Sequence, residues 1–292
     1  MGESGLSLRL GVVIVAHNSQ ALLKDCIDFL RADSAESASA EVWVVDSGSF
    51  DGSLPNADAI RADRLLLAPN YGYGISANLA VANGLRADWY VIMNPDARIS
   101  LNELANLISL AEQGGAGIAA PALDQSFPHG HFLRVPRPPW RHVTCYDGVL
   151  DETRGFQVAA AHGSIIAINR HCFSDLEGFD TSYFLYFEEI DLCVRARAIG
   201  YTVSCFPAVK GWHAGESSSS GVPSLWRDVE RLRGKLTFYR KHYSGFEARC
   251  LLVMELVKRR RHIVQALRQL SRDPHANLPW PPRPIGFVEE WT

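Results

Sequence analysis

Short apolar runs alternate with helical segments over roughly the first 120 residues, and this alternation restricts the fold more than any other feature. The strand-like runs cover residues 8–15, 41–45, 64–67, 89–93 and 117–121. Residues 20–30, 75–85 and 101–111 have the apolar spacing of helices. Strands that alternate with helices form βαβ units, whose strands are parallel and whose helices cover the sheet. The sequence therefore predicts an α/β fold with a mixed, mainly parallel sheet flanked by helices.

The pattern becomes irregular after residue 124. Residues 125–141 contain prolines among histidines and arginines, and a long irregular segment inside a compact domain is often a binding loop. Residues 163–168 then predict a buried strand, and residues 187–199 predict a helix.

Composition excludes several classes of protein. The 292 residues are 47% apolar and 21% charged, with a net charge of −3, which gives no case for nucleic acid binding. The six cysteines form no C-x-x-C pair, which predicts reduced thiols and a cytoplasmic protein. No basic secretory leader is expected at the N-terminus. No apolar run approaches the roughly 18 residues that span a bilayer.

The fourth strand-like run ends abruptly at the turn Asn94-Pro95-Asp96. Proline fixes one backbone dihedral, so the carboxylate that follows it is presented rigidly. Ligands of open α/β sheets gather at the carboxyl ends of strands, where one carboxylate suits Mg²⁺ bridging to a diphosphate. A solvated aspartate in a simple turn is the alternative.

The segment from Gly72 to Ala77 matches the G-x-G-x-x-A fingerprint of dinucleotide-binding proteins, and Asp96 follows at about the spacing of a ribose-binding acid. That fingerprint belongs at the first strand–helix turn of its fold. Here two strand–helix units precede it, so the support for a dehydrogenase is weak.

An ordered series of motifs resembles the inverting family-two glycosyltransferases of the GT-A fold, and especially their rhamnosyltransferase-like branch. The resemblance runs from about residue 8 to residue 243. It is carried by residues 13–19, 44–53, 70–78, 94–96, 178–180, 186–193 and 213–217. Each motif alone is weak, whereas their order is specific. Asn94-Pro95-Asp96 matches the family's Asp-x-Asp motif, and the segment that begins at His213 resembles its His-x-x-x-Ser motif.

The resemblance implies a set of residues that bind the donor nucleotide: His17, Asn18, Asp46, Gly74, Asn78, Asn94 and Asp96. Asp46 would accept a hydrogen bond from the base, although an aspartate there could also cap its own turn. Asp96 and His213 would hold Mg²⁺ or Mn²⁺ against the diphosphate, and the cation would act as a Lewis acid.

The resemblance also implies a catalytic base near residue 189. Glu189 stands where the family usually has aspartate, and Glu188 or Asp191 could share its role. Asp191 could instead be structural, since Arg195 follows it at i,i+4. Phe179 and Asp180 are expected at the acceptor.

The resemblance implies transfer of a sugar, with rhamnose as one candidate, from a dTDP- or UDP-linked donor to a saccharide or lipid-linked acceptor. His162 stands where the family often has a small residue, which predicts an unusual sugar specificity. A nucleotidyltransferase and a catalytically silent nucleotide-sugar-binding protein are the alternatives. A nucleotidyltransferase would be expected to show a glycine-rich basic loop near its N-terminus, and residues 16–19 show none.

The domain expectation is one glycosyltransferase domain over residues 1–225, with a nucleotide-binding half at about 1–124 and an acceptor half at about 125–225. Residues 226–292 form a C-terminal helical extension with a proline-rich tail that is extended or disordered. The extension is rich in lysine and arginine among apolar residues, as in helices that lie on anionic membranes. Peripheral contact with the inner face of the cell membrane is therefore one expectation, and a solvated helical face packed on the main domain is the other. The sequence leaves a homodimer open.

Overall fold

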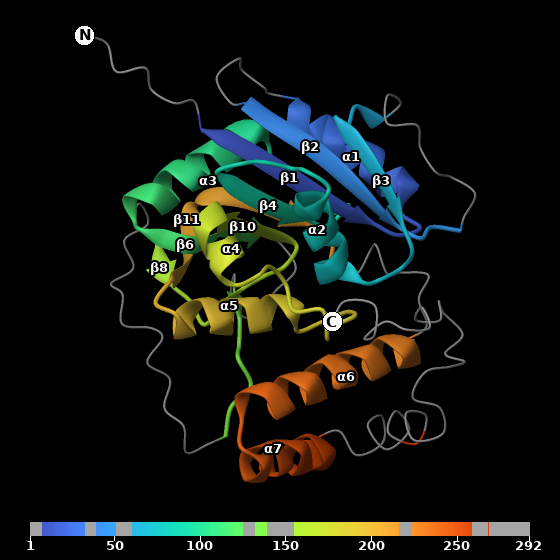
Figure 1. The fold of residues 1–292 in the computed structure, drawn as a ribbon, viewed down its shortest axis with the longest axis vertical. Coiled ribbons are helices and arrows are strands. Elements are labelled where there is room, and N and C mark those ends of the chain that lie inside the picture. Colours follow the sequence, from blue (N-terminus) through green and yellow to red (C-terminus); the bar gives the residue numbers. More distant parts are fainter. Residues whose placement is uncertain are drawn as a thin grey trace.

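A computed structural model describes residues 8–32, 39–50, 60–124, 132–138, 155–215, 224–258 and 268. Its central element is a mixed sheet that runs through the molecule (Figure 1). The strands follow the order β3 (Arg64–Ala68), β2 (Ser39–Ser47), β1 (Arg9–Ala16), β4 (Trp89–Met93), β10 (Ile165–Asn169), β6 (Ala116–Asp124), β11 (Thr202–His213) and β5 (Ala97–Arg98). A short strand, β8 (Phe156–Gln157), also pairs with β11.

Strand β10 reverses the direction of the chain in the middle of the sheet. Strands β3, β2, β1 and β4 are all parallel, as the alternating pattern predicts. The next strand, β10, runs antiparallel to both of its neighbours, β4 and β6. Beyond β10, strands β6 and β11 are again parallel to each other. The expected mixed, mainly parallel α/β architecture is therefore confirmed.

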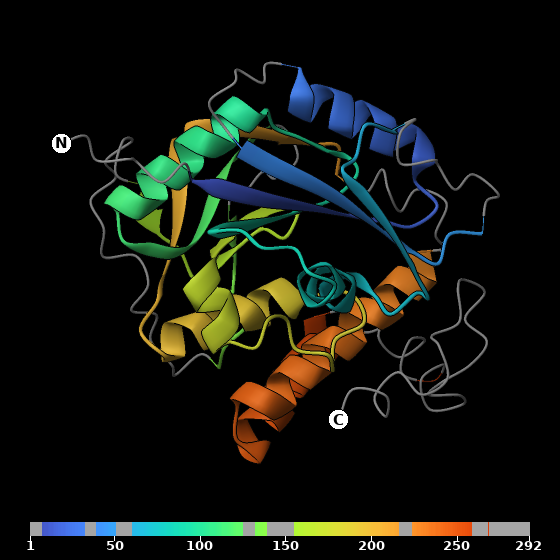
Figure 2. The same cartoon turned by 45° about the horizontal axis from the view of Figure 1, so that its top comes forward.

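Helices cover both faces of the sheet (Figures 1 and 2). Alternate side chains of a strand point to opposite faces, so Val12 and Ile14 of β1 enter one apolar cluster while Val13 and Val15 enter the other. The first cluster includes α1 (Gln20–Arg31) and α3 (Leu101–Gln113). The second includes α2 (Tyr73–Ala82), α4 (Arg170–Asp175) and α5 (Glu188–Ala198).

Two further helices, α6 (Ser224–His242) and α7 (Gly245–Lys258), form the C-terminal extension beside α5 (Figure 1). The chain breaks between them because Ser244 begins a new helix. Its hydroxyl accepts a hydrogen bond from the Glu247 amide at 3.3 Å, and the Glu247 carboxylate accepts one from the Ser244 amide at 3.1 Å. Within the described residues, no helix has the length and apolar character that crossing a membrane requires.

One long element departs from the sequence-based expectation. Strand β11 was not predicted, yet it pairs with β6, β5 and β8. Its register against β6 shifts between Phe206 and Lys210, which hides the regular alternation of a strand. Of the predicted loop at 125–141, only residues 132–138 are described, and Phe132–Leu133 (β7) pairs with Ala160–Ala161 (β9). The tail at 274–292 lies outside the described residues.

Strand β10 joins the two halves of the sheet, so its buried side chains are expected to dominate stability. Ile166 is fully buried in the cluster under α2 and α5. Ile166→Ala should lower the free energy of unfolding by about 2–5 kcal/mol through lost burial and the cavity it leaves. Urea unfolding measures this difference. The control is Leu67→Ala on β3, where the side chain is 62% exposed, and it should change stability by less than about 0.5 kcal/mol. Equal effects of the two substitutions would contradict the assignment of β10 to the core.

Candidate active site

Asp96 and His213 are brought together by the pairing of two strands. The short strand β5 begins directly after Asp96 and pairs with the end of β11, so that Ala97 lies opposite His213. The Ala214 amide also donates to the Asp96 carbonyl oxygen at 3.1 Å. Asp96 Oδ1 lies 3.1 Å from His213 Nε2, and the two residues are only 3% and 5% exposed. The two residues predicted as metal ligands are therefore adjacent and buried.

This pair suits a divalent cation that also binds a diphosphate. Adjacent ligands of an octahedral ion at about 2.1 Å are themselves about 3 Å apart, which matches the Asp96–His213 separation. Asn94 Nδ2 lies 3.3 Å from the same nitrogen of His213. The described residues contain no group of three or more His, Cys, Asp or Glu side chains arranged around one metal position. A cation here would need oxygen ligands from the substrate, as Mg²⁺ usually does.

His162 lies next to the Asp96–His213 pair, with its ring centroid 5.5 Å from that of His213. The Ser164 amide donates to His162 Nδ1 at 3.1 Å, which leaves the proton of a neutral ring on Nε2. Burial, reinforced by the proximity of His213, lowers the pKa of His162 to about 4. His162 is therefore a neutral imidazole with its proton on Nε2, next to the Asp96–His213 pair.

Glu188 and Glu189 occupy the first turn of α5. Burial raises the pKa of Glu188 well above its ordinary value, and the neighbouring charge of Glu189 adds to this. Burial also raises the pKa of Glu189, to about 6, against the opposing effect of backbone hydrogen bonds at the helix start. Oε2 of each side chain is buried without a hydrogen-bond partner among the described residues. A buried carboxyl group that titrates near neutrality can accept a proton in a reaction.

Residues 162–164 lie between the Asp96–His213 pair and the carboxyl groups of Glu188 and Glu189. Gly163, between His162 and Ser164, lies against the Glu189 side chain, since a Cβ there would be 3.4 Å from Glu189 Cβ and Cγ. The Tyr73 hydroxyl donates to the Gly163 carbonyl oxygen at 2.6 Å. Burial raises the pKa of Tyr73 well above its usual range, and the charges of Glu188, Glu189 and Asp96 reinforce this. The acids and the Asp96–His213 pair thus belong to one site. Gly163 adds a contact outside every motif, and Tyr73, within the 70–78 motif, adds one for which no role was predicted.

His17, Asn18 and Asp46 gather at the carboxyl ends of β1 and β2. The His17 Nδ1–H donates to the Ser47 carbonyl oxygen at 2.7 Å. The Asn18 side-chain oxygen accepts a hydrogen bond from the Phe50 amide at 2.9 Å. Asp46 Oδ1 accepts from the Ser49 amide at 2.8 Å, so Asp46 caps its own turn, as the alternative for it states. A contact between these residues and a nucleoside stays a prediction.

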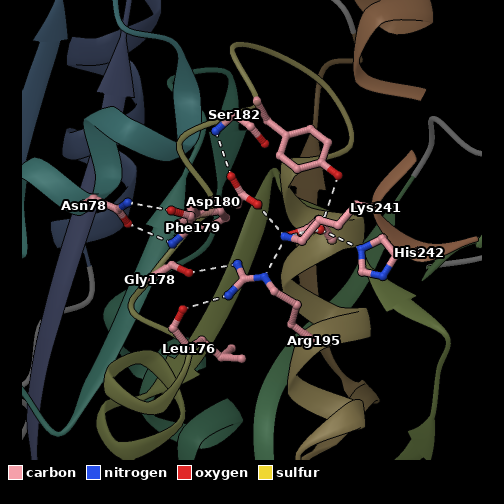
Figure 3. Close-up of polar contacts among 11 residues, drawn as sticks. Asn78, Leu176, Gly178, Phe179, Asp180, Ser182, Arg195, Lys241 and His242 are labelled. Atoms are coloured by element: carbon pink, nitrogen blue, oxygen red, sulfur yellow. Dashed lines mark hydrogen bonds and ion pairs between the residues drawn. The ribbon is translucent and has the colours of Figure 1, made fainter. Parts of the chain in front are cut away.

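Asn78 and Gly74, whose contact with the donor stays a prediction, both contact Phe179. Both ends of the Asn78 amide bond the backbone of Phe179, with the side-chain nitrogen 2.8 Å from its carbonyl oxygen and the side-chain oxygen 2.9 Å from its amide (Figure 3). A Cβ on Gly74 would lie 2.8 Å from Phe179 Cβ. These two residues therefore position the segment that carries Phe179.

The side chain of Phe179, which was predicted to lie at the acceptor, is buried in the core. Its side chain is 1% exposed, and its ring packs edge-on against Tyr73 and Phe173 in the core. The neighbouring Asp180 remains accessible in part, and its carboxylate contacts the Ser182 amide and Lys241. Asp180 is the better candidate for the acceptor side.

Asp191 is also excluded as a base. Its buried carboxylate accepts hydrogen bonds at 2.7 to 3.2 Å from four side chains: Tyr183, Arg195, Lys241 and His242 (Figure 3). Burial alone would raise the pKa of Asp191, but the bonds from His242, Lys241 and Arg195 outweigh it and lower the pKa to about 2. A carboxylate held this way does not accept a proton near neutrality. The structural role, with the expected Arg195 partner, is the observed one.

Known proteins are similar to this chain in sequence and in fold. Residues 11–176 match the family model of Glycosyl transferase family 2. N-acetylglucosaminyl-diphospho-decaprenol L-rhamnosyltransferase of Mycobacterium tuberculosis is 29% identical over 215 residues, which cover 63% of this chain and 69% of that protein. The low-salt glycan biosynthesis hexosyltransferase Agl10 of Haloferax volcanii is 24% identical over 198 residues, covering 64% of this chain and 61% of that one.

Solved structures share the architecture at lower identity. The mannosyltransferase PcManGT of Pyrobaculum calidifontis, in complex with GDP-Man and Mn²⁺, aligns with a TM-score of 0.58 at 17% identity, over 94% of this chain and 78% of that one. TarS of S. aureus with UDP-GlcNAc aligns with a TM-score of 0.56 at 14% identity, over 80% of this chain and 66% of the other. The chain therefore belongs to glycosyl transferase family 2 and is a glycosyltransferase of the GT-A fold.

Proposed function

We propose that this chain transfers a sugar, with inversion, from a nucleoside-diphosphate donor to a hydroxyl group of a saccharide or lipid-linked saccharide. The observation that carries the proposal is the juxtaposition of the Asp96–His213 pair with Glu189 across the segment around Gly163. Rhamnose carried by dTDP is our first candidate donor, because the Mycobacterium tuberculosis relative is an L-rhamnosyltransferase. A UDP-linked donor is the second.

On the donor side, Asp96 and His213 would hold Mg²⁺ or Mn²⁺ together with the diphosphate. When bound, the cation supplies Lewis-acid stabilisation of the charge on the departing diphosphate. The His162 ring lies next to this pair, and its Nε2–H would donate to a donor oxygen. Residues 17, 18 and 46 would surround the nucleoside at the ends of β1 and β2.

On the acceptor side, Glu189 would take the proton of the attacking hydroxyl group through Oε2. In-line inversion needs such a base on the face opposite the leaving group, and a positioned base contributes about 10²–10⁴-fold. The glutamate is one methylene longer than the usual aspartate, and its side chain packs against Gly163. Glu188, whose pKa is raised further, stays protonated and leaves Glu189 as the charged member of the pair.

The first test separates an active enzyme from a silent binding protein. Glu189→Gln keeps the size of the side chain but removes the base, so transfer should fall by about 10²-fold or more. Donor affinity, measured by titration calorimetry with dTDP-rhamnose, should stay within about twofold. The wild-type rate should also decrease as pH falls through about 6, where Glu189 becomes protonated. Glu177→Gln, at an exposed glutamate, is the control; unchanged turnover of Glu189→Gln would refute the assignment.

The second test addresses the cation. Mn²⁺ should tighten the binding of dTDP-rhamnose to the wild type by at least about tenfold, since the pair and the phosphates share the ion. That gain should be lost in His213→Ala and Asp96→Asn and kept in His171→Ala, where the histidine is exposed. An equal gain in all variants would show that Asp96 and His213 form only a hydrogen-bonded pair.

We also propose that α7 contacts an anionic membrane, which would bring the site to a lipid-linked acceptor. Its apolar side chains Phe246, Val253 and Val257 are 71%, 56% and 61% exposed and recur at helical spacing. Arg249 is exposed on the same helix, and basic residues continue through 258–261 in the sequence. Apolar side chains beside basic ones are typical of interfacial helices.

Replacing these three apolar residues together by serine should abolish sedimentation with phosphatidylglycerol vesicles, because the apolar contact is lost. Leu67→Ser, on the exposed strand β3, should bind as the wild type does. Light scattering distinguishes a second outcome. A wild-type dimer that the triple substitution converts to a monomer would assign the α7 face to self-association and contradict the membrane proposal.

A further inference from the structure

Lys241, at the C-terminal end of α6, joins two carboxylates that belong to different parts of the site (Figure 3). Its ammonium group lies 2.9 Å from Asp191 Oδ1 on α5 and also contacts the Asp180 carboxylate. Asp191 is fully buried, whereas Asp180 and Lys241 are partly exposed. Two carboxylates this close to one cation would repel each other if the cation were removed.

Asp191 connects Lys241 to the acidic turn, by which we mean the first turn of α5 with Glu188 and Glu189. It lies one helical turn after Glu188, and its amide donates to the Phe187 carbonyl oxygen at 2.9 Å. The His242 ring, adjacent to Lys241 on α6, bonds the same carboxylate at 2.7 Å. The position of the first turn of α5 therefore depends on the end of α6.

The same cluster holds the segment that carries Asp180. Arg195, which bonds Asp191 at 2.7 Å, also donates to the carbonyl oxygens of Leu176 and Gly178 at 2.8 and 2.9 Å. Lys241 contacts Asp180 at the far end of this segment (Figure 3). Lys241 therefore connects the Asp180 carboxylate to α5, the helix that carries Glu189.

The turn before the base is strained and is braced by α6. Tyr186 and Phe187 both have left-handed backbone angles, with φ of 67° and 75°, which non-glycine residues keep only when packing holds them. Gly234 of α6 lies so close to this turn that a Cβ would be 2.3 Å from the Tyr186 carbonyl oxygen. The Phe238 ring of α6 packs 5.8 Å from that of Phe187.

We propose that Lys241 is a positioning residue for sugar transfer, because it sets the Asp180 carboxylate relative to the helix turn that presents Glu189. This role rests on the proposed function, and it assigns the C-terminal extension a part in acceptor geometry. The carboxylates that Lys241 contacts, Asp180 and Asp191, lie on the acceptor side, so Lys241 should affect transfer more than donor binding.

Hydrogen exchange tests the structural half of the proposal without any substrate. Lys241→Met keeps the aliphatic stem and removes the charge, so the amides of residues 179–191 should exchange at least about tenfold faster than in the wild type. Lys24→Met is the matched control, since Lys24 pairs with Asp28 on α1, against the opposite face of the sheet. Exchange at residues 179–191 that is equal in the two variants would overturn the proposal.

Kinetics tests the functional half, with dTDP-rhamnose as donor and a synthetic N-acetylglucosaminyl-diphospho-prenol as acceptor. Lys241→Met should lower kcat by about 10–100-fold, the loss expected for misplacement by about an ångström, with donor affinity within about twofold of wild type. In the Glu189→Gln background the same substitution should lower residual transfer by less than about threefold, because the group it positions is already absent.

The proposal would be overturned if Lys241→Met lowered kcat by the same factor in the Glu189→Gln background as in the wild type. A loss of donor binding that accompanied the fall in kcat would also overturn it. If Lys241→Met does not fold, Lys241→Gln, which retains an N–H donor, replaces it with the same criteria. A wild type that transfers no sugar would count against the proposed function alone, and the exchange comparison would still decide whether Lys241 fixes the acidic turn.

Discussion

The site depends on one strand pairing, between β5 and the last residues of β11. The stiff Asn94-Pro95-Asp96 turn delivers a carboxylate at the end of β4, and the antiparallel contact of Ala97 with His213 places an imidazole 3.1 Å from it. On a free loop each side chain would keep its rotamer and backbone freedom, and holding the two together would cost more conformational entropy. The remaining groups of the site are arranged around this buried pair.

Burial of acidic groups is the second constraint, and it opposes stability. A glutamate whose pKa is raised by burial is stabilised in its neutral form, so the folded state loses stability as pH rises through the folded-state pKa, here about 6 for Glu189. This loss of stability falls on Glu188 and Glu189, the residues proposed to include the catalytic base. Asp191 causes no such loss of stability, because Arg195, Lys241 and His242 donate hydrogen bonds to its carboxylate. Two neighbouring acidic positions of one helix thus have opposite electrostatic environments.

Local patterns predicted the parts of the fold that depend on local physics. Strand β4 is observed with the expected bounds, and the first three helices lie where their apolar spacing placed them. Strand β11 was missed because a register shift near Phe206 interrupts its alternation. Phe179 was assigned to the acceptor because its neighbours form a family motif, whereas its burial is decided by Tyr73 and Phe173, which are distant in sequence. Motifs predicted which residues lie close together, such as Asp96 and His213, but they did not indicate which side chains would be buried in the core.

Asp191 shows why this limit matters for function. Its i,i+4 partner Arg195 is visible in the sequence, but Lys241 and His242 come from a helix some fifty residues further on, beyond the 11–176 segment that matches the family. The residues predicted to bind the nucleotide all lie within that segment, whereas the contacts that connect Asp180 to the first turn of α5 lie outside it. A chain built this way can change its C-terminal extension, and with it the geometry offered to an acceptor, while its donor site stays the same. Differences in acceptor among relatives are therefore to be sought in helices that no catalytic motif includes.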